Sequence, residues 1–369
     1  MNRIKPIDGL RTLAIVGVMW AHVWMFFGNL PMKVANIDVN RFLAFGGIGV
    51  DLFFVISGFC MYLMHTHKNV IFSTESYKQF IIKRWKRIAP AFYVAVISAA
   101  FFYFVKNGVF PFKSLVYHLF FINIFNGQNI LSPPFWSLST EWHFYLILPL
   151  IFIADKLGKW IFTRIIILMS ISLILRFWLF HGYNLSSGIT VPGYEIWYRF
   201  IEFGFGMLAA RFYIQQNKLP GLLSGSIGFI ISFCIAFLGR AFMTADFFSR
   251  FGKMDFIVRA FGEPVLTLGF AIMILNLVTT TSIFERIISS SPFLFIGRIS
   301  YSMYLWHWPI AVWISYYIGE MIGKSVIDME LAFLLTFVAT IGVAIVSYHF
   351  LEASYFKRPE VEKHLQKDL

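Results

Sequence analysis

The chain has 369 residues, of which 58% are hydrophobic and only 14% are charged, and its formal net charge at pH 7 is +12. This composition excludes a soluble domain, because apolar runs long enough to cross a bilayer recur along the chain. The two cysteines, Cys60 and Cys234, both lie inside apolar runs, so they indicate neither a disulfide framework nor a metal-ligand spacing. We expect a membrane protein with buried thiols and no bound metal.

Ten long apolar segments and one shorter piece follow in chain order. The first segment is too long for a cleavable signal peptide and lacks a small-residue cleavage site, which predicts a signal anchor. The shorter piece, near 115–125, predicts a re-entrant or interfacial helix, since it cannot cross the bilayer. We predict an all-α integral membrane protein, a bundle of about ten transmembrane helices with spans near 10–28, 46–64, 88–105, 137–155, 160–180, 196–213, 222–239, 257–278, 296–318 and 330–352.

Positive charge is distributed unevenly between the two sets of predicted loops. The segments on the same side as the N-terminus hold 20 Lys and Arg residues, whereas those on the other side hold nine. Because cytoplasmic loops carry the excess of Lys and Arg, both termini are expected in the cytoplasm. The basic charge therefore reports topology, and no nucleic-acid partner is needed to explain it. Residues 1–352 are expected to form one membrane domain, followed by a short basic cytoplasmic tail, 353–369.

The first span carries two ionisable residues, Arg11 and His22, in an otherwise apolar run from Leu10 to Phe27. Eleven residues amount to three helical turns plus about 20°, so both side chains lie on one face, about 16 Å apart along the axis. Such groups are unfavourable in lipid and must face protein or water. One interpretation is a snorkelling arginine and a hydrogen-bonded histidine within the bundle. The other is a functional pair.

Two further clusters precede the middle of the chain. In the second span, glycines at 46, 49 and 58 and Ser57 permit close helix approach, and packing is the favoured role for most of them. The basic run 83–90 contains Arg84 and Arg87, three residues apart at the start of the third span. It is typical of a flank that contacts anionic lipid. Two guanidinium groups beside Trp85 suit a phosphorylated, adenine-bearing ligand equally well.

Three later spans also place polar side chains on one helical face each. Glu141 and Tyr145 lie four residues apart in the fourth span, and Arg199 and Glu202 lie three apart in the sixth. The second pair is as consistent with an internal ion pair as with a functional role. In the ninth span, one face combines Ser300, Tyr304 and His307. His307, flanked by two tryptophans, is interpreted either as a packed core residue or as part of a site.

Six motifs occur in the same order as in a known family. Together they make the chain resemble the acyltransferase-3 family of bacterial membrane acyltransferases, from Asp8 to about Glu352. The motifs are the Arg11–His22 pair, GVDLFFVISGF at 49–59, KRWKRIAP at 83–90, WSLSTEWHFY at 136–145, RFIEFGFGMLAAR at 199–211 and GRISYSMYLWHWP at 297–309.

The resemblance implies a ten-helix bundle with cytoplasmic termini in the inner membrane of a bacterium, so 1–352 is expected to be a membrane acyltransferase domain. It implies essential roles for the arginine and histidine of the first helix and a cytoplasmic acyl-CoA donor, with acetyl as the expected group. The implied acceptor is an extracytoplasmic glycan or lipid-linked oligosaccharide, such as lipopolysaccharide O-antigen or exopolysaccharide. The chain departs from the family at Glu352-Ala353-Ser354, where relatives often have Glu-x-Pro. It also lacks the C-terminal esterase-like domain of some relatives, so the bundle is expected to complete the transfer alone.

The chemistry of acyl transfer assigns roles to these residues. Transfer from a thioester to a hydroxyl needs a held donor, an activated hydroxyl and a stabilised oxyanion. His22, whose imidazole titrates near neutral pH, is expected to be the base, with Glu141 as a second catalytic residue. Arg11, Arg84 and Arg87 are expected to bind donor phosphates. The remaining candidate site residues are Asp8, Ser57, Trp136, Ser137, Tyr145, Arg199, Tyr304 and His307.

Several alternatives remain open from the sequence. Direct transfer is the leading mechanism, with a donor passage expected along Ala14, Ile15 and Val18, and a covalent relay through Ser57 or Ser137 stands beside it. A transporter or flippase would also use broken helices and midplane charges, although the two halves show no internal symmetry. A non-catalytic assembly or sensor protein would not need the polar face of the first helix.

Overall fold

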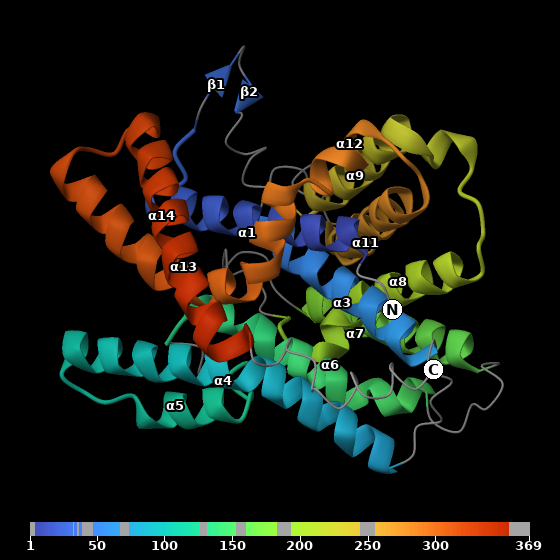
Figure 1. The fold of residues 1–369 in the computed structure, drawn as a ribbon, viewed down its shortest axis with the longest axis horizontal. Coiled ribbons are helices and arrows are strands. Elements are labelled where there is room, and N and C mark those ends of the chain that lie inside the picture. Colours follow the sequence, from blue (N-terminus) through green and yellow to red (C-terminus); the bar gives the residue numbers. More distant parts are fainter. Residues whose placement is uncertain are drawn as a thin grey trace, which may run out of the picture.

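Every long element that the structure describes is a helix (Figure 1). The computed structural model describes residues 4–31, 33–34, 37–38, 47–66, 74–125, 131–152, 160–182, 193–243 and 255–353. Two short strands, β1 (Lys33–Val34) and β2 (Ile37–Asp38), pair antiparallel. The longer helices are α1 (Lys5–Phe26), α3 (Gly49–Thr66), α4 (Thr74–Asn107), α6 (Trp136–Phe152), α7 (Ile161–Gly182), α8 (Ile196–Ile214), α9 (Gly225–Ala241), α11 (Asp255–Thr279), α13 (Ser291–Met321) and α14 (Val326–Ser347).

Short elements connect or extend these helices. They are α5 (Phe112–Leu119), the 3₁₀ turns η2 (Pro133–Phe135) and η4 (Gly221–Leu223), α12 (Ile283–Ile288) and the π-helical turn η6 (Tyr348–Glu352) that continues α14. The short apolar piece expected near 115–125 is thus helical over Phe112–Leu119. Eight residues rise only about 12 Å, too little to cross a bilayer. Its end is tied to α4, where the Tyr93 hydroxyl donates to the carbonyl of Leu119 at 2.9 Å.

A helix lies at the position of each of the ten predicted spans, which confirms the all-α fold class. Six of these helices are long and apolar enough to cross a membrane, namely α1, α3, α4, α7, α11 and α14. Helices α6 and α9 have only 17 residues each, and α8 carries Arg199, Glu202 and Arg211 within its length. Ten crossings and cytoplasmic termini therefore stay predictions. The tail from 354 onward lies outside the described residues.

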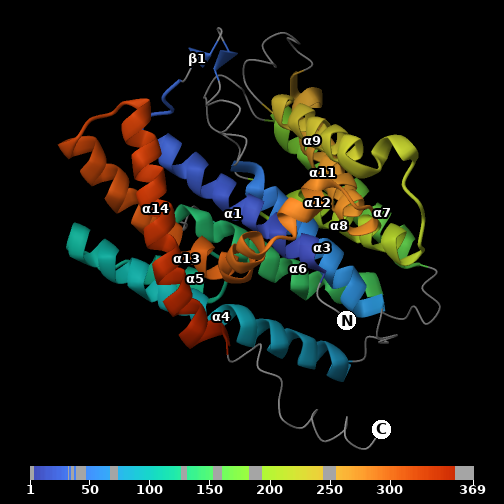
Figure 2. The ribbon, with the colours of Figure 1, turned by 45° about the horizontal axis from the view of Figure 1, so that its top comes forward.

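Helix α1 passes through the middle of the bundle, between α13 on one side and α3 on the other (Figures 1 and 2). Glycines allow these neighbours to approach closely. A Cβ on Gly297 of α13 would lie 1.9 Å from the carbonyl oxygen of Asp8 in α1. Where α3 crosses α8, a Cβ on Gly58 would lie 2.1 Å from the carbonyl of Phe203, and one on Gly206 would lie 2.0 Å from that of Val55. The packing role predicted for the glycines of the second span is confirmed at Gly58.

Aromatic stacking holds α6 against α8 and so fixes the orientation of the polar face of α6. The rings of Phe144 and Phe203 stack with centroids 4.0 Å apart, and both side chains are fully buried. On the opposite side of α6, Trp142 stacks on Phe121 at 5.2 Å and contacts Trp85 of α4 edge-on. With these faces occupied, the remaining face of α6, which carries Ser137, Glu141 and Tyr145, lines a cavity at the centre of the molecule.

Candidate active site

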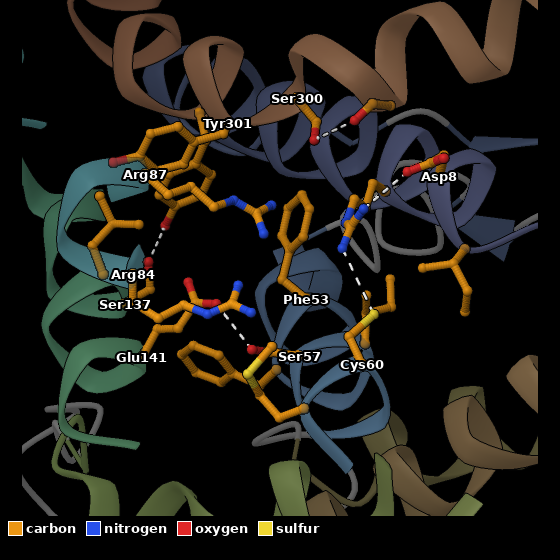
Figure 3. A pocket seen from close by; sticks show the side chains of 18 of the residues that line it. Asp8, Phe53, Ser57, Cys60, Arg84, Arg87, Ser137, Glu141, Ser300 and Tyr301 are labelled. Carbon is orange, nitrogen blue, oxygen red and sulfur yellow. Dashed lines mark hydrogen bonds and ion pairs between the residues drawn. The ribbon is translucent and has the colours of Figure 1, made fainter. Parts of the chain in front are cut away.

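A cavity of about 760 Å³ lies among α1, α3, α4, α6, α13 and the π-helical turn η6 (Figure 3). Its volume falls in the range of ligand pockets, which is roughly 300–1,000 Å³. The structure brings most of the candidate site residues from the sequence together here, although they come from five separate helices. Those lining the cavity are Asp8, Arg11, Ser57, Arg84, Arg87, Ser137, Glu141, Tyr145 and Tyr304.

Glu141 is the acceptor at the centre of a small hydroxyl network. Its Oε1 accepts a hydrogen bond from the Tyr145 hydroxyl at 2.5 Å, as their i, i+4 spacing predicts. The same oxygen accepts from the Ser57 hydroxyl of α3 at 2.9 Å, a contact between helices that no spacing rule gives. A serine hydroxyl that donates to a carboxylate can pass its proton to that carboxylate, so Ser57 has the partner that a nucleophile needs.

Ser137 is bound differently from Ser57. Its hydroxyl oxygen lies 2.7 Å from that of Tyr304, and these two hydroxyls lie 3.1 and 2.8 Å from the backbone carbonyl of Pro134. Because the carbonyl can only accept, the Ser137 and Tyr304 hydroxyls donate their protons within this group of three oxygens. Among the described residues, no carboxylate is therefore placed to take the proton of Ser137 here. Between the two serines that the sequence offered, the geometry favours Ser57 as the nucleophile of a covalent relay.

Four arginines line the cavity, against three carboxylates. Arg84 is buried, and its guanidinium lies 5.4 and 5.6 Å from the ring centroids of Phe80 and Tyr145. Figure 3 shows Arg84 and Arg87 reaching in from α4, on the side opposite Asp8. The complete charged set is Arg11, Arg84, Arg87 and Arg298 with Asp8, Glu141 and Glu352. The excess of cationic guanidinium groups suits an anionic ligand, because the guanidinium fork binds phosphate in a bidentate manner.

Arg11 has local partners of its own. Its Nη1 forms an ion pair with Oδ1 of Asp8 at 2.9 Å, and its Nη2 lies 3.9 Å from Sγ of Cys60. The side chain is 23% exposed and lines the cavity. The two residues come from one helical turn, and the Asp8 carboxylate therefore orients the guanidinium that the sequence assigns to phosphate binding.

His22 and His307 form a pair outside this cavity. Nδ1 of His22 lies 2.9 Å from Nε2 of His307, and the rings are nearly parallel, with 9° between their planes. Nδ1 of His307 lies 2.7 Å from the carbonyl oxygen of Tyr304, which can only accept a proton. In a neutral pair, His307 therefore donates from Nδ1 and accepts at Nε2, and His22 donates from Nδ1. This assignment leaves Nε2 of His22 as an unprotonated base.

Tyr304 connects the histidine pair with the cavity. Its hydroxyl lines the cavity beside Ser137, whereas its carbonyl oxygen accepts from His307. The rings of Tyr304 and His307 are 5.4 Å apart. The common face of Arg11 and His22 is confirmed only in part, since Arg11 lines the cavity and His22 does not.

The donor passage expected along α1 is wrong in this structure. Ala14, Ile15 and Val18 are at most 1% exposed, and none of them lines the cavity. Ala14 and Val18 pack against α3 at Gly49, where an added Cβ would lie 2.2 Å from the Ala14 carbonyl oxygen. The face was expected to be open because its residues are apolar and one of them is small. A small residue opposite a glycine instead brings the two helices into direct contact.

Arg199 belongs to a separate buried ion cluster. Its Nη1 contacts one carboxylate oxygen each of Asp51 at 3.1 Å, Glu202 at 2.9 Å and Glu263 at 3.1 Å. Arg176 of α7 pairs with the other oxygen of Glu263. Among the described residues, these three carboxylates are the one group placed to hold a metal ion. The Arg199 guanidinium already contacts all three, so it takes the place of a cation.

Trp136, the remaining candidate, lies between this cluster and the cavity. Its ring lies 5.0 Å from the Arg199 guanidinium carbon on one side and stacks on Tyr194 at 4.4 Å. The next residue, Ser137, faces the cavity. Trp136 and Arg199 therefore support the first turn of α6 without lining the cavity. The internal ion pair, one of the two interpretations from the sequence, is present.

Sequence reasoning missed Glu352 and Arg298 as cavity residues. Glu352 ends the π-helical turn, is 3% exposed and accepts a hydrogen bond from Ser302 of α13. The sequence signal for Glu352 is a carboxylate at the end of an apolar helix, since such a group must face protein or water. Arg298 lies within the motif at 297–309, where Ser300, Tyr304 and His307 were the residues considered for a site.

Comparison with known proteins defines the class of this domain. A family model described as an acyltransferase domain matches residues 4–349, nearly the whole chain. The match includes the Arg11–His22 pair, the histidine pair and every residue that lines the cavity except Glu352. The chain belongs to this acyltransferase family, which confirms the resemblance drawn from its six motifs.

Two relatives show what the chain is similar to. The peptidoglycan O-acetyltransferase OatA of Listeria monocytogenes is 28% identical over 344 residues, covering 83% of this chain and 49% of the relative. The O-acetyltransferase OatA of Staphylococcus aureus is 25% identical over 387 residues, covering 96% of this chain and 57% of the relative. The chain thus spans about half the length of the curated relatives it matches. No solved structure is significantly similar to it.

Proposed function

We propose that this domain transfers an acetyl group from acetyl-CoA to a hydroxyl group of an extracytoplasmic glycan. Its family and the names of its relatives support O-acetyl transfer over the transporter and the non-catalytic alternatives. Both sequence-based acceptors, lipopolysaccharide O-antigen and exopolysaccharide, are glycans. The Listeria relative is named for peptidoglycan, and this makes peptidoglycan the acceptor to test first.

Donor binding is assigned to the cavity. Arg84 and Arg87 enter it from α4, and Arg11 lines it from α1. Guanidinium groups bind a diphosphate through charge-assisted hydrogen bonds, each contributing about 1.5–3 kcal/mol when it is shielded from water. The half-apolar lining, which includes Val50 and Phe53, suits the flexible arm that carries the thioester.

The observation that carries the proposal is the contact of His22 with His307 at 2.9 Å and of His307 with the Tyr304 carbonyl at 2.7 Å, from which the tautomers are assigned. With Nδ1 of His22 donating to His307, Nε2 of His22 is the atom that accepts the proton of an acceptor hydroxyl. The hydroxyl oxygen then attacks the thioester carbonyl, the carbon–sulfur bond breaks, and the thiolate leaves. His22 returns its proton to that sulfur, so the enzyme ends in its starting state.

The reacting groups meet at Tyr304, which lines the cavity and also bonds to His307. In direct transfer, the thioester lies beside Tyr304, within reach of His22. In a covalent relay, Ser57 attacks the thioester and Glu141 takes its proton, after which the acyl group passes to the acceptor. Direct transfer remains the leading mechanism, because it uses the histidine pair and needs one acyl transfer, whereas the covalent relay needs two.

Labelled acetyl-CoA tests the proposal. The full chain in lipid nanodiscs is incubated with acetyl-labelled CoA and soluble peptidoglycan fragments, and the label on the glycan is measured by mass spectrometry. Wild-type protein should acetylate the fragments, and a His22→Ala variant that is equally folded should not. If wild-type protein transferred no label to the glycan and released no labelled acetate by hydrolysis, the protein would not be an acetyltransferase. Lipopolysaccharide and exopolysaccharide fragments, run in parallel, identify the acceptor class.

A further inference from the structure

A second cavity, of about 1,380 Å³, lies at the start of α1. It is enclosed by the last residues of α3, α8 and α11 together with the segment between α8 and α9. Ile4 and Leu63 line both this cavity and the first one. The two cavities are therefore neighbours at the N-terminal end of α1, and a ligand that reached from the first into the second would pass Ile4 and Leu63.

The lining of the second cavity combines apolar and polar side chains and carries more cations than anions. Lys5 and Lys218 are exposed, and within the described residues neither forms an ion pair. Glu285 is the one carboxylate among the lining residues, and it accepts a hydrogen bond from Ser289 in its own helix. Thr279, Thr280 and Thr281, with Gln216 and Asn217, add hydroxyl and amide groups.

Three helices end at this cavity with their carboxyl termini. The last turn of an α-helix leaves carbonyl oxygens without intrahelical partners, and these oxygens accept hydrogen bonds. Thr66 of α3, Ile214 of α8 and Thr279 of α11 lie at or near these ends. Carbonyl acceptors match the exocyclic amine of a purine, whereas the two lysines match a phosphate. The lining thus offers both kinds of group that a phosphorylated nucleoside requires.

Residues along helix α1 reach the second cavity, the first cavity and the histidine pair in that order. Lys5 lines the second cavity, Arg11 the first, and His22 lies at the far end of the same helix. At 1.5 Å per residue, Lys5 is about 9 Å from Arg11, which in turn is about 16 Å from His22. Coenzyme A has the same sequence of parts, with a nucleoside 3′-phosphate, a diphosphate and a long arm that ends in the thioester.

We propose that the second cavity binds the adenosine 3′-phosphate end of the coenzyme A donor, with Lys5 and Lys218 contacting the phosphate. This inference rests on the proposed function, because that function supplies the donor. With the diphosphate at Arg11, Arg84 and Arg87 and the thioester directed toward Tyr304, the nucleoside leaves the first cavity at its opposite side. Ile4 and Leu63, which line both cavities, lie along this path.

Donors that differ only at the nucleotide end test this assignment. The full chain in zwitterionic nanodiscs is given acetyl-CoA, acetyl-3′-dephospho-CoA or S-acetyl-4′-phosphopantetheine, and KM and kcat are measured for each. We expect Lys218→Ala and Lys5→Ala to raise KM for acetyl-CoA about three- to tenfold, with kcat unchanged. Neither variant should change KM for S-acetyl-4′-phosphopantetheine, which lacks the nucleoside. Lys86→Ala removes an exposed lysine of α4 that lines neither cavity and serves as the matched control.

Each other outcome overturns the assignment. Equal KM changes for all three donors, or changes no larger than those of Lys86→Ala, would show that the lysines do not contact the nucleotide end. A KM effect that appears only when anionic lipid is present would assign the lysines to lipid headgroups. If wild-type protein uses none of the three donors, the proposed function itself fails, and this is seen before any variant is made.

Discussion

Nδ1 of His22 and Nε2 of His307 lie 2.9 Å apart, although the two residues are 285 positions apart in the chain. The carbonyl oxygen of Tyr304 fixes the proton on the far nitrogen of His307, which in turn fixes the proton of His22. Edge-on contact with Trp308, at 4.9 Å, holds the His22 ring from a second direction. The tautomer of His22, and with it the nitrogen proposed as the base, therefore depends on His307 and on the backbone of Tyr304.

Replacing the base itself should abolish transfer. We expect His22→Ala to lower kcat/KM for acetyl-CoA about 10²–10⁴-fold, the usual loss when a general base is removed. Activity of the purified variant measures this, with the amount of folded protein in the membrane as the control. Acetylation close to the wild-type rate would show that His22 is not the base.

His307 should be replaceable by a residue that accepts at the same position. The Oε1 atom of glutamine can occupy the place of Nε2 of histidine, so His307→Gln should keep more activity than His307→Ala. We expect the alanine variant to lose about tenfold or more in kcat and the glutamine variant to recover part of that loss. The pH dependence of kcat separates positioning from packing, because loss of the fixed tautomer alters the profile. Identical activities and profiles for the two variants would contradict a positioning role.

The arginines of α4 should bind the donor through phosphate contacts. In the double variant Arg84→Ala and Arg87→Ala, coenzyme A should bind about 10–100-fold more weakly, and the remaining binding should depend less on salt. Calorimetry with coenzyme A measures both effects. The matched control is Lys83→Ala with Lys86→Ala, which removes two charges from the same run at exposed positions that do not line the cavity. If the two double variants had equal effects, the basic run 83–90 would serve topology or lipid contact and not donor binding.

Bulk added inside the cavity should obstruct the donor without weakening the fold. Val50 lines the cavity and is half-buried, so Val50→Trp is expected to raise KM for the donor at an unchanged melting temperature. Ala14→Trp falls in close contact between α1 and α3 and should lower stability by about 1–3 kcal/mol or more. Leu13→Trp, on the exposed face of α1, is the control. If Val50→Trp lost activity only in proportion to its loss of stability, the cavity would not be the donor site.

Removal of Arg199 should unfold the protein more than it alters chemistry. Arg199→Met leaves the carboxylates of Asp51, Glu202 and Glu263 close together without the guanidinium that contacts all three. Breaking a buried ion network by removing one partner typically costs about 3–5 kcal/mol. Thermal unfolding measures the loss, and Arg211→Met, at the more accessible end of the same helix, is the control. An active-site role would instead be indicated by lost activity at unchanged stability.

Contacts within one helix could be predicted from the sequence, and contacts between helices could not. The i, i+4 spacing of Glu141 and Tyr145 predicted their shared face, and the structure places them in a hydrogen bond. The bond from Ser57 to the same carboxylate joins residues 84 positions apart, and it depends on how α3 crosses α6. The periodicity of a sequence predicts which residues share a helix face, but it does not predict how two helices cross.

The misplaced donor passage has the same origin. Helical geometry correctly put Ala14 and Val18 on the face between Arg11 and His22, but it could not say what that face contacts. Gly49 of α3 fills the position where a passage was expected. The neighbouring helix decides whether a stripe of small residues is a channel wall or a packing surface.

The close approach of α13 to α1 has a consequence for access to the site. Gly297 packs directly on the backbone of Asp8, the Thr12 hydroxyl donates to the carbonyl of Phe293, and His22 bonds to His307 at the other end. The Tyr301 hydroxyl of α13 also donates to the carbonyl of Ile88 in α4, at 2.8 Å. Helix α13 therefore links the wall that carries Arg11 with the wall that carries Arg84 and Arg87, and a ligand that enters the cavity passes between walls held together by the same helix.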